Sequence, residues 1–283
     1  FHLYPLLSPL LEINQCPKEL YIKGNLTEKD ENTKVLCVVG SRKCSPYGRE
    51  CVDYLLSGLT GHDIIIVSGL ALGIDSAAHK SALKYKLKTI SFPGSGLNEE
   101  VLYPASNIKL ADEIIEHGGA LISEYEPKTK SALHTFPARN RLMAAVSDLV
   151  LIVEAEEKSG TQITARLALE YNKDVAIVPG SIFSKLSTGT AKLFKDGAYP
   201  VTESTDILQL LGLNSTPTQE SLFDGDTLSD NDKKILQMLD YPKSRDEIIE
   251  SSGLLAHEAF ISLTTLESLG YISDTFGEIK KLV

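Results

Sequence analysis

Residues 136–181 read FPARNRLMAAVSDLVLIVEAEEKSGTQITARLALEYNKDVAIVPGS, and this stretch decides the fold. Apolar runs at 149–154 and 174–179 flank a segment whose apolar residues recur with helical spacing. A strand, a helix and a second strand in this order form a crossover unit, so the two strands are parallel. Ligands of open α/β sheets bind at the carboxyl ends of the strands. Because small and basic residues stand at those ends, the stretch also predicts where a binding site lies.

The same alternation of strands and helices extends over residues 34–213. Further apolar strands are expected at 34–40, 64–68, 88–92 and 120–124, with a short one near 199–202. Helices are expected after the capping pair Ser45-Pro46, at 74–84, up to about 117, and at 206–211. The pattern predicts an α/β fold with a Rossmann-like, doubly wound and mostly parallel sheet.

The segments outside this domain have different compositions. Residues 1–33 are expected to be the remnant of an N-terminal helical region and a linker. Residues 214–228, rich in Ser, Thr and Pro, are expected to be a second linker. Residues 229–283 suggest three helices, starting at Ser229, Ser244 and Ala256, and then a hairpin formed by 270–273 and 276–282. This order is typical of a small winged-helix domain.

Composition narrows the class of protein. The chain has 283 residues, of which 42% are apolar and 23% charged, as in ordinary globular proteins. Without an apolar run of 18 residues, no membrane insertion is expected. Four cysteines without a C-x-x-C pair favour reduced thiols in the cytoplasm. The net charge is −10, but residues 34–213 carry 19 Lys and Arg against 20 Asp and Glu, which leaves room for a basic groove.

Glycine-containing turns follow several of the expected strands. They are Gly40-Ser41-Arg42, the turn from Ser68 to Gly73, Pro93-Gly94-Ser95-Gly96, Ser159-Gly160-Thr161 and Pro179-Gly180-Ser181. Glycine and serine let backbone N–H groups approach an anion, and arginine binds phosphate bidentately. Together the turns predict a long anion-binding crevice. Its candidate residues are Ser41, Arg42, Lys43, Gly69, Gly73, Gly94, Ser95, Gly96, Phe136, Arg139, Asn140, Arg141, Lys158, Ser159, Gly160 and Thr161.

Plainer explanations of the same residues stay open. Each glycine turn is also compatible with a simple tight turn, and each lysine or arginine with a solvated surface position. Phe136 is either a core aromatic or, beside Arg139, a platform on which a base stacks. Asp75 and His79 are interpreted as helix-capping and packing residues, and no catalytic set is recognised. No dinucleotide fingerprint, P-loop or metal-ligand spacing is present, so no cofactor and no metal are expected.

Ordered blocks of this sequence resemble the DprA/Smf family of DNA-processing proteins. The blocks are VVGSRKCSPYG (38–48), IVSGLALGIDSAAHKSAL (66–83), PGSGLNEEVLYPASN (93–107), ISEYEP (122–127), FPARNR (136–141), EAEEKSGTQITARLAL (154–169), VPGS (178–181) and KDGA (195–198). The resemblance implies a protein, not an enzyme, that binds and protects single-stranded DNA and helps to load RecA recombinase during natural transformation. It also implies a homodimer, and competence or single-strand-binding proteins as further partners.

The resemblance assigns Arg42, Phe136, Arg139, Asn140 and Arg141 to the DNA-binding region. One position departs from the family: an asparagine is common two residues after the glycine that Gly189 matches, and this chain has Ala191 there. Contacts made by that asparagine are therefore not expected here.

Two competing functions remain. Ser159-Gly160-Thr161 resembles the signature of Lonely-guy phosphoribohydrolases, but Thr164 stands where those enzymes have a glutamate. The winged helix is alternatively a reader of duplex DNA. Its third helix contains Glu258 and Glu267 but no lysine or arginine, and recognition of guanine edges and phosphates needs such donors. We therefore expect residues 229–283 to have a protein-contact or regulatory role.

Overall fold

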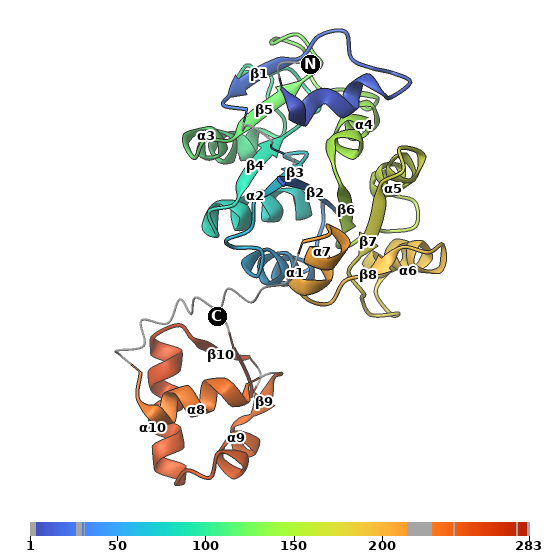
Figure 1. Cartoon of the computed structure of the whole chain (residues 1–283). Coiled ribbons are helices and arrows are strands. Elements are labelled where there is room, and N and C mark those ends of the chain that lie inside the picture. Colours follow the sequence, from blue (N-terminus) through green and yellow to red (C-terminus); the bar gives the residue numbers. More distant parts are fainter. Residues whose placement is uncertain are drawn as a thin grey trace. The chain divides into compact units, whose positions relative to one another are not determined.

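The structure is a computed structural model, and it describes residues 4–26, 30, 32–213, 228–239, 241–275 and 277–281. The chain divides into two compact units, Phe1–Pro217 and Thr218–Val283 (Figure 1), and each is described by itself. Most of the expected linker, residues 214–227, lies outside the described residues, as does Phe276 of the expected hairpin. In the part of the chain that the structure describes, no helix is both long and apolar enough to cross a membrane.

The first unit is built on an eight-stranded sheet in the order β1-β5-β4-β3-β2-β6-β7-β8. The strands are β1 (Tyr21–Gly24), β2 (Lys34–Val39), β3 (Ile64–Ser68), β4 (Lys88–Ser91), β5 (Ala120–Ser123), β6 (Leu149–Ile152), β7 (Asp174–Ile177) and β8 (Tyr199–Pro200). β1 pairs with β5 antiparallel, and all other neighbours are parallel. The predicted α/β fold with a mostly parallel sheet is therefore confirmed.

Helices cover both faces of this sheet (Figure 1). They are α1 (Pro46–Ser57), α2 (Ile74–Lys84), α3 (Ile108–Glu116), α4 (Thr135–Val146), α5 (Gly160–Glu170), α6 (Thr188–Lys195) and α7 (Ser204–Leu210), with short 3₁₀ turns η1 (Pro5–Leu11), η2 (Ala105–Asn107) and η3 (Lys185–Ser187). Successive strand side chains point to opposite faces. Val35 and Cys37 of β2 therefore pack with α4, α5 and η1, whereas Leu36 and Val38 pack with α1, α2 and α7.

The structure differs from the sequence-based expectation in two segments. Residues 1–33 were expected to lie outside the domain, but β1 extends its sheet, and the buried side chains of Leu6, Leu7 and Leu10 join its core. No helix was expected between the strands at 120–124 and 149–154, but the FPARNR block forms the first half of α4. The apolar run from Leu142 to Val146 anchors that helix, because all five side chains are buried.

The second unit has three helices and a three-stranded antiparallel sheet. The helices are α8 (Asp230–Met238), α9 (Arg245–Ser252) and α10 (Ala256–Ser268), and the sheet has the order β10 (Ile272–Thr275), β11 (Glu278–Lys281), β9 (Lys243–Ser244). Ser229 and Ser244 cap α8 and α9 through capping boxes, which confirms the two predicted helix starts.

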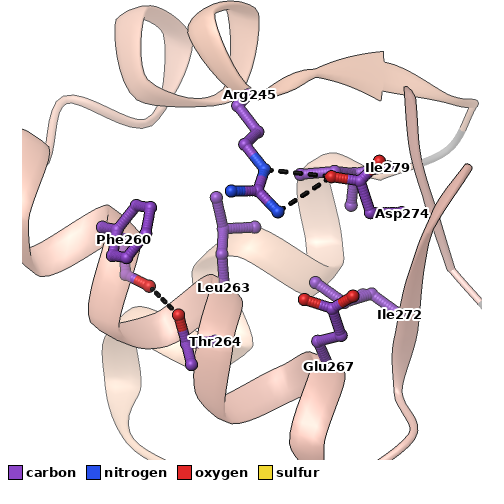
Figure 2. A pocket seen from close by; sticks show the side chains of 8 residues that line it. All are labelled: Arg245, Phe260, Leu263, Thr264, Glu267, Ile272, Asp274 and Ile279. Carbon is purple, nitrogen blue, oxygen red and sulfur yellow. Dashed lines mark hydrogen bonds and ion pairs between the residues drawn. The ribbon is translucent and has the colours of Figure 1, made fainter. Parts of the chain in front are cut away.

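A small cavity in the second unit lies between α10 and the sheet (Figure 2). Arg245 pairs with Asp274 at 2.8 Å beside it, and the Arg245 guanidinium lies 5.8 Å from the centroid of the Phe260 ring. The cavity measures about 10 Å³, which is close to the least space that a single water requires. It therefore offers no room for an organic ligand.

Candidate nucleic-acid interface

The predicted glycine turns share one edge of the sheet. β4, β3, β2, β6 and β7 are neighbours and all parallel, so their carboxyl ends lie side by side. We call this the carboxyl edge. The chain continues from it through Gly40-Ser41-Arg42 after β2, Gly69 after β3 and Gly94 after β4. Ile74 N–H donates to Ser41 O at 3.2 Å, so the first two of these turns touch.

Arg42 projects from the turn after β2. The turn is held by Ser41, whose N–H donates to Glu154 O at 2.7 Å and whose hydroxyl accepts from Lys43 N–H at 3.1 Å. Arg42 and Lys43 are both exposed. No hydrogen bond or ion pair joins the Arg42 guanidinium to another described residue. Its N–H groups are therefore available to an external anion.

Phe136, in the first turn of α4, supports this guanidinium. Arg42 Cζ lies 4.5 Å from the centroid of the Phe136 ring, within the range of a cation–π contact. A Cβ added to Gly94 would lie 2.6 Å from Cδ1 of that ring, so only glycine fits beneath it. Arg42 therefore lies against the Phe136 ring. The ring supports this arginine and does not offer two free faces to bases.

Tyr103 is an aromatic neighbour that the sequence pattern did not single out. Its ring centroid lies 5.6 Å from that of Phe136, with the planes inclined by 53°. The side chain is 44% exposed. It extends the aromatic surface beside Arg42 and can stack on a base. An aromatic residue inside the glycine-rich loop at 93–107 was the available signal, but nothing in the sequence placed it beside α4.

Arg139 is brought to the carboxyl edge but faces inward. Its side chain is buried, and its Nη1 donates to Gly69 O and Phe92 O, which follow β3 and β4. A Cβ on Gly69 would collide with this guanidinium. Asp75 accepts hydrogen bonds from the same loop, including one from Gly69 N–H at 3.1 Å. The expectation that Arg139 contacts DNA is corrected, because its donors fix two turns together.

Arg141 is also committed to an internal partner. Its guanidinium binds both carboxylate oxygens of Glu124, at 2.7 and 2.6 Å, and its Nε donates to Gln15 O at 3.1 Å. Both charged side chains are largely buried. Two of the three arginines expected to bind phosphate therefore stabilise the fold through internal contacts. Of the three, Arg42 alone presents a guanidinium with no hydrogen bond or ion pair to another described residue.

Ser95 and Gly96 likewise turn away from the carboxyl edge. Ser95 is fully buried, and its carbonyl accepts from the Ser123 hydroxyl at 2.7 Å. Gly96 N–H donates to Thr129 O at 2.8 Å, and a Cβ on Gly96 would meet the carbonyls of Glu126 and Pro127. The 126–129 segment uses their backbone groups, so the expectation that Ser95 and Gly96 bind DNA is corrected as well.

The Ser159-Gly160-Thr161 group forms the start of α5. Gly160 is exposed, and a Cβ placed on it would meet open space. The first turn contains no acidic residue, and Lys158 beside it is exposed. Asn140 of α4 reaches Gly160 O at 3.4 Å, which links this group to the Phe136 region. Free N–H groups at a helix N-terminus attract anions. The Thr161 side chain is buried, so this residue can offer only its backbone N–H to an anion.

A buried carboxylate occupies the point where the strand order reverses. Glu154 follows β6, next to β2, and is 4% exposed. It accepts hydrogen bonds from Ser45 N–H at 2.8 Å and from the Ser45 hydroxyl at 2.5 Å, at the N-terminus of α1. A Cβ on Gly48 would lie 2.5 Å from its Oε2. The usual phosphate position of a Rossmann-like sheet is therefore taken by the chain's own glutamate.

Comparisons with known proteins identify the family of this chain. The profile of the family described as DNA recombination-mediator protein A matches residues 2–212. The chain is 43% identical over 199 residues to the DNA processing protein DprA of Streptococcus pneumoniae, covering 70% of this chain and 68% of that protein. It is 35% identical over 280 residues to the Smf protein of Escherichia coli, covering 96% of this chain and 74% of that protein.

Two solved structures share the fold. The crystal structure of DprA from Streptococcus pneumoniae aligns with a TM-score of 0.67 and 40% identity, over 73% of this chain and 71% of that one. A structure of DNA processing protein A from Helicobacter pylori, described for its single-stranded DNA binding mode, aligns with a TM-score of 0.63 and 31% identity, over 74% and 92%. The resemblance found in the sequence blocks is confirmed. The chain belongs to the DNA recombination-mediator protein A family.

Proposed function

We propose that this protein binds single-stranded DNA along the carboxyl edge. The observation that carries the proposal is Arg42, an exposed guanidinium held over Phe136, with no hydrogen bond or ion pair to the other residues that the structure describes. Lys43, Lys158 and the free N-terminus of α5 add positive potential on the same side of the sheet. A row of phosphate contacts suits an extended polyanion rather than one small anion.

Aromatic side chains favour single strands over duplexes. Tyr103 lies beside Phe136, which supports Arg42, and stacking on the Tyr103 ring requires bases that are not paired inside a helix. The Helicobacter pylori relative, described for its single-stranded DNA binding mode, supports the same choice.

A direct test compares an oligothymidine with a duplex of equal length by fluorescence anisotropy at several salt concentrations. We expect the single strand to bind at least tenfold more tightly. Arg42→Ala should weaken binding about tenfold or more, because a charge-assisted hydrogen bond contributes about 1.5–3 kcal/mol. The slope of log affinity against log salt should become shallower by about 0.7 for each phosphate that the variant no longer neutralises.

Arg166→Ala is the matched control for this test. Arg166 lies on α5 in the same unit, exposed and paired with Glu170 at 3.4 Å. We expect its removal to leave the affinity unchanged. Equal binding of duplex and single strand, or equal losses of affinity for Arg42→Ala and Arg166→Ala, would remove the basis of the proposal.

We further propose that the bound strand is protected in the cytoplasm and handed to RecA recombinase during natural transformation, without catalysis. The family description as a recombination mediator supports this role. Competence proteins and single-strand-binding proteins are the further partners proposed. A strand-exchange assay on DNA covered with single-strand-binding protein provides the test, since a mediator should shorten the lag before RecA acts.

A homodimer is proposed for the first unit. Its support is a set of exposed apolar side chains near α6, β7 and β8, which are neighbours in the fold. They are Ile182 (86% exposed), Phe183 (92% exposed), Phe194 and Tyr199. Large exposed apolar groups of this kind mark protein interfaces. Light scattering should give a dimer for the wild type and a monomer for Phe183→Glu with Phe194→Glu.

We propose that the second unit is a winged-helix domain that contacts protein. α10 occupies the place of a recognition helix in the chain order, yet it contains no lysine or arginine. Its exposed side chains include Phe260 and Ile261. An apolar helix surface suits a protein partner better than the phosphates of duplex DNA.

The phosphoribohydrolase alternative finds less support. Thr164, which stands where those enzymes carry a glutamate, is almost completely buried in α5. Glu154 already binds Ser45, the N-cap of α1, where a nucleotide phosphate would bind. Release of free base from nucleoside monophosphates would reinstate this function.

A further inference from the structure

The outer edge of β1 is left without a partner. β1 is the terminal strand of the large sheet, and β5 is its sole neighbour among the strands that the structure describes (Figure 1). An unpaired strand edge presents N–H and C=O groups that can bond to another extended chain. The residues Ile22, Lys23 and Gly24 are exposed there.

A groove of about 760 Å³ adjoins this strand. Its apolar lining comes from Tyr21 and Ile22 of β1, Leu97 of the loop after β4, Ile108 at the start of α3, and Pro127 after β5. The volume is large enough for several side chains of a peptide. A free edge and an adjacent apolar groove are the two elements that strand addition requires: backbone bonds give affinity, and alternate side chains fill the groove.

The surroundings of the groove are acidic. Glu99 and Glu100 line it, both are exposed, and neither pairs with another described residue. Glu19 lies 3.1 Å from the Tyr21 hydroxyl, and Glu19 and Glu126 both act to raise the pKa of Tyr21. The one lysine of the lining, Lys23, lies 3.9 Å from Asp112. Negative charge therefore prevails, which disfavours DNA and favours a cationic occupant.

We propose that this groove docks an extended, lysine- or arginine-containing segment of another protein, which adds to the sheet as a strand beside β1. A second copy of the chain fits less well, because a symmetric contact would place Glu99 and Glu100 of one copy near the same glutamates of the other. The surface is separate from the DNA-binding site, since none of the residues proposed to bind DNA lines it. The proposal therefore does not depend on the proposed function.

The test uses the full chain and two end-blocked hexapeptides as probes, one alternating valine with lysine and the other alternating valine with glutamate. Titration followed by isothermal calorimetry should show the cationic peptide binding at least tenfold more tightly. Hydrogen exchange should become slower at residues 21–24 in its presence, because the outer N–H groups of β1 become bonded. Faster or unchanged exchange at β1 would contradict strand addition.

Charge reversal at the rim provides the second arm. Glu99→Lys with Glu100→Lys should weaken the cationic peptide at least tenfold and strengthen the anionic one. Glu12→Lys with Glu116→Lys is the matched control, because both glutamates are exposed in the same unit and neither lines the groove. Its affinity for the cationic peptide should stay within about twofold of the wild type.

Further results would overturn the proposal. They are equal binding of both peptides, equal losses of affinity in the two charge-reversal variants, and displacement of the cationic peptide by oligothymidine. A fall in the oligomeric mass of the Glu99→Lys, Glu100→Lys variant, measured by light scattering, would also overturn it by identifying the groove as a self-association surface. The peptide experiments can be interpreted in the same way whether or not the protein binds single-stranded DNA.

Discussion

The guanidinium of Arg42 lies 4.5 Å from the centroid of the Phe136 ring, although 94 positions separate the two residues in sequence (136 minus 42). A guanidinium stacked in this way keeps its N–H edges free, and those edges bind phosphate. Under the proposed function, the ring therefore orients the cation before DNA arrives, which lowers the entropy cost of ordering a long side chain.

Phe136→Leu tests this orienting role. We expect affinity for oligothymidine to fall about threefold to tenfold, since an exposed cation–π contact contributes about 0.5–1 kcal/mol and the ring also adjoins Tyr103. Phe136→Tyr should stay near the wild type, because it keeps the ring. Fluorescence anisotropy at fixed salt measures both, and a Leu variant that binds as tightly as the Tyr variant argues against an aromatic support.

Arg139→Met should act on stability rather than on DNA contact. The substitution leaves Gly69 O and Phe92 O without their donor in a buried site, and we expect a loss of about 2–4 kcal/mol in the free energy of unfolding. Arg42→Ala should change it by less than about 0.5 kcal/mol, because Arg42 is exposed. Urea denaturation separates the two arginines. If Arg139→Met is as stable as the wild type, Arg139 is not needed to hold the fold and is again a candidate for contact with DNA.

Gly160→Ala probes the start of α5. The added methyl group meets open space, and alanine is about 0.8–1.0 kcal/mol better than glycine inside a helix, so we expect equal or higher stability. Affinity for single-stranded DNA should nevertheless fall severalfold, because the methyl group keeps phosphate away from the N–H groups of the first turn. Thermal denaturation and anisotropy are measured on one sample. Unchanged affinity would place the DNA elsewhere.

His79 predicts a pH dependence of stability. Thr89 Oγ1 donates to Ile66 O at 3.0 Å, so it accepts from His79 Nδ1 at 2.8 Å, which fixes the neutral tautomer. Burial lowers the pKa of His79 from 6.5 to about 3. The unfolded chain therefore takes up the proton first, and stability falls as pH drops below 6.5, by at most about 1.4 kcal/mol per pH unit.

His79→Asn keeps a donor to Thr89 and does not titrate. Its free energy of unfolding should fall less steeply than that of the wild type between pH 6.5 and 5, while His117→Asn, at an exposed position, should follow the wild type. Urea titrations at each pH provide the comparison. Parallel curves for wild type and His79→Asn would show that the histidine is not held neutral.

Removal of residues 214–283 tests the division between the two units. The first unit has its own core, formed on both faces of the large sheet. We expect residues 1–213 to fold and to bind oligothymidine within about twofold of the full chain, because the residues proposed to contact DNA all precede residue 214. A folded fragment without affinity for DNA would assign binding to the second unit instead.

The parallel strands and most helices could be predicted because their signals are local. β3 and α2 begin and end where the apolar runs and the turn residues place them, and Ser45, Ser229 and Ser244 cap helices as expected. α4 was missed because its first half, the FPARNR block, shows no helical repeat of apolar residues. The apolar residues after it were the signal for a helix, since leucine, methionine and alanine are strong helix formers.

The interior of the site could not be predicted because it depends on distant partners. Glu124 neutralises Arg141, and the carbonyls of Gly69 and Phe92 use the donors of Arg139. Sequence spacing gives no sign of these pairings, so an internal arginine and an exposed one have the same local pattern. β1 was missed because four residues at a sheet edge bury too little apolar surface to show strand periodicity.

The glutamate that binds Ser45 at the start of α1 has a consequence for selectivity. The start of α1 lies beside the point where the strand order reverses, and a Rossmann-like sheet binds nucleotide phosphates at such a position. Glu154 is tethered to the sheet and never diffuses away, so a mononucleotide would have to displace a permanent competitor. Under the proposed function, a long strand lies across the other turns and does not need that position, so Glu154 would exclude monomers from the start of α1 without excluding the polymer.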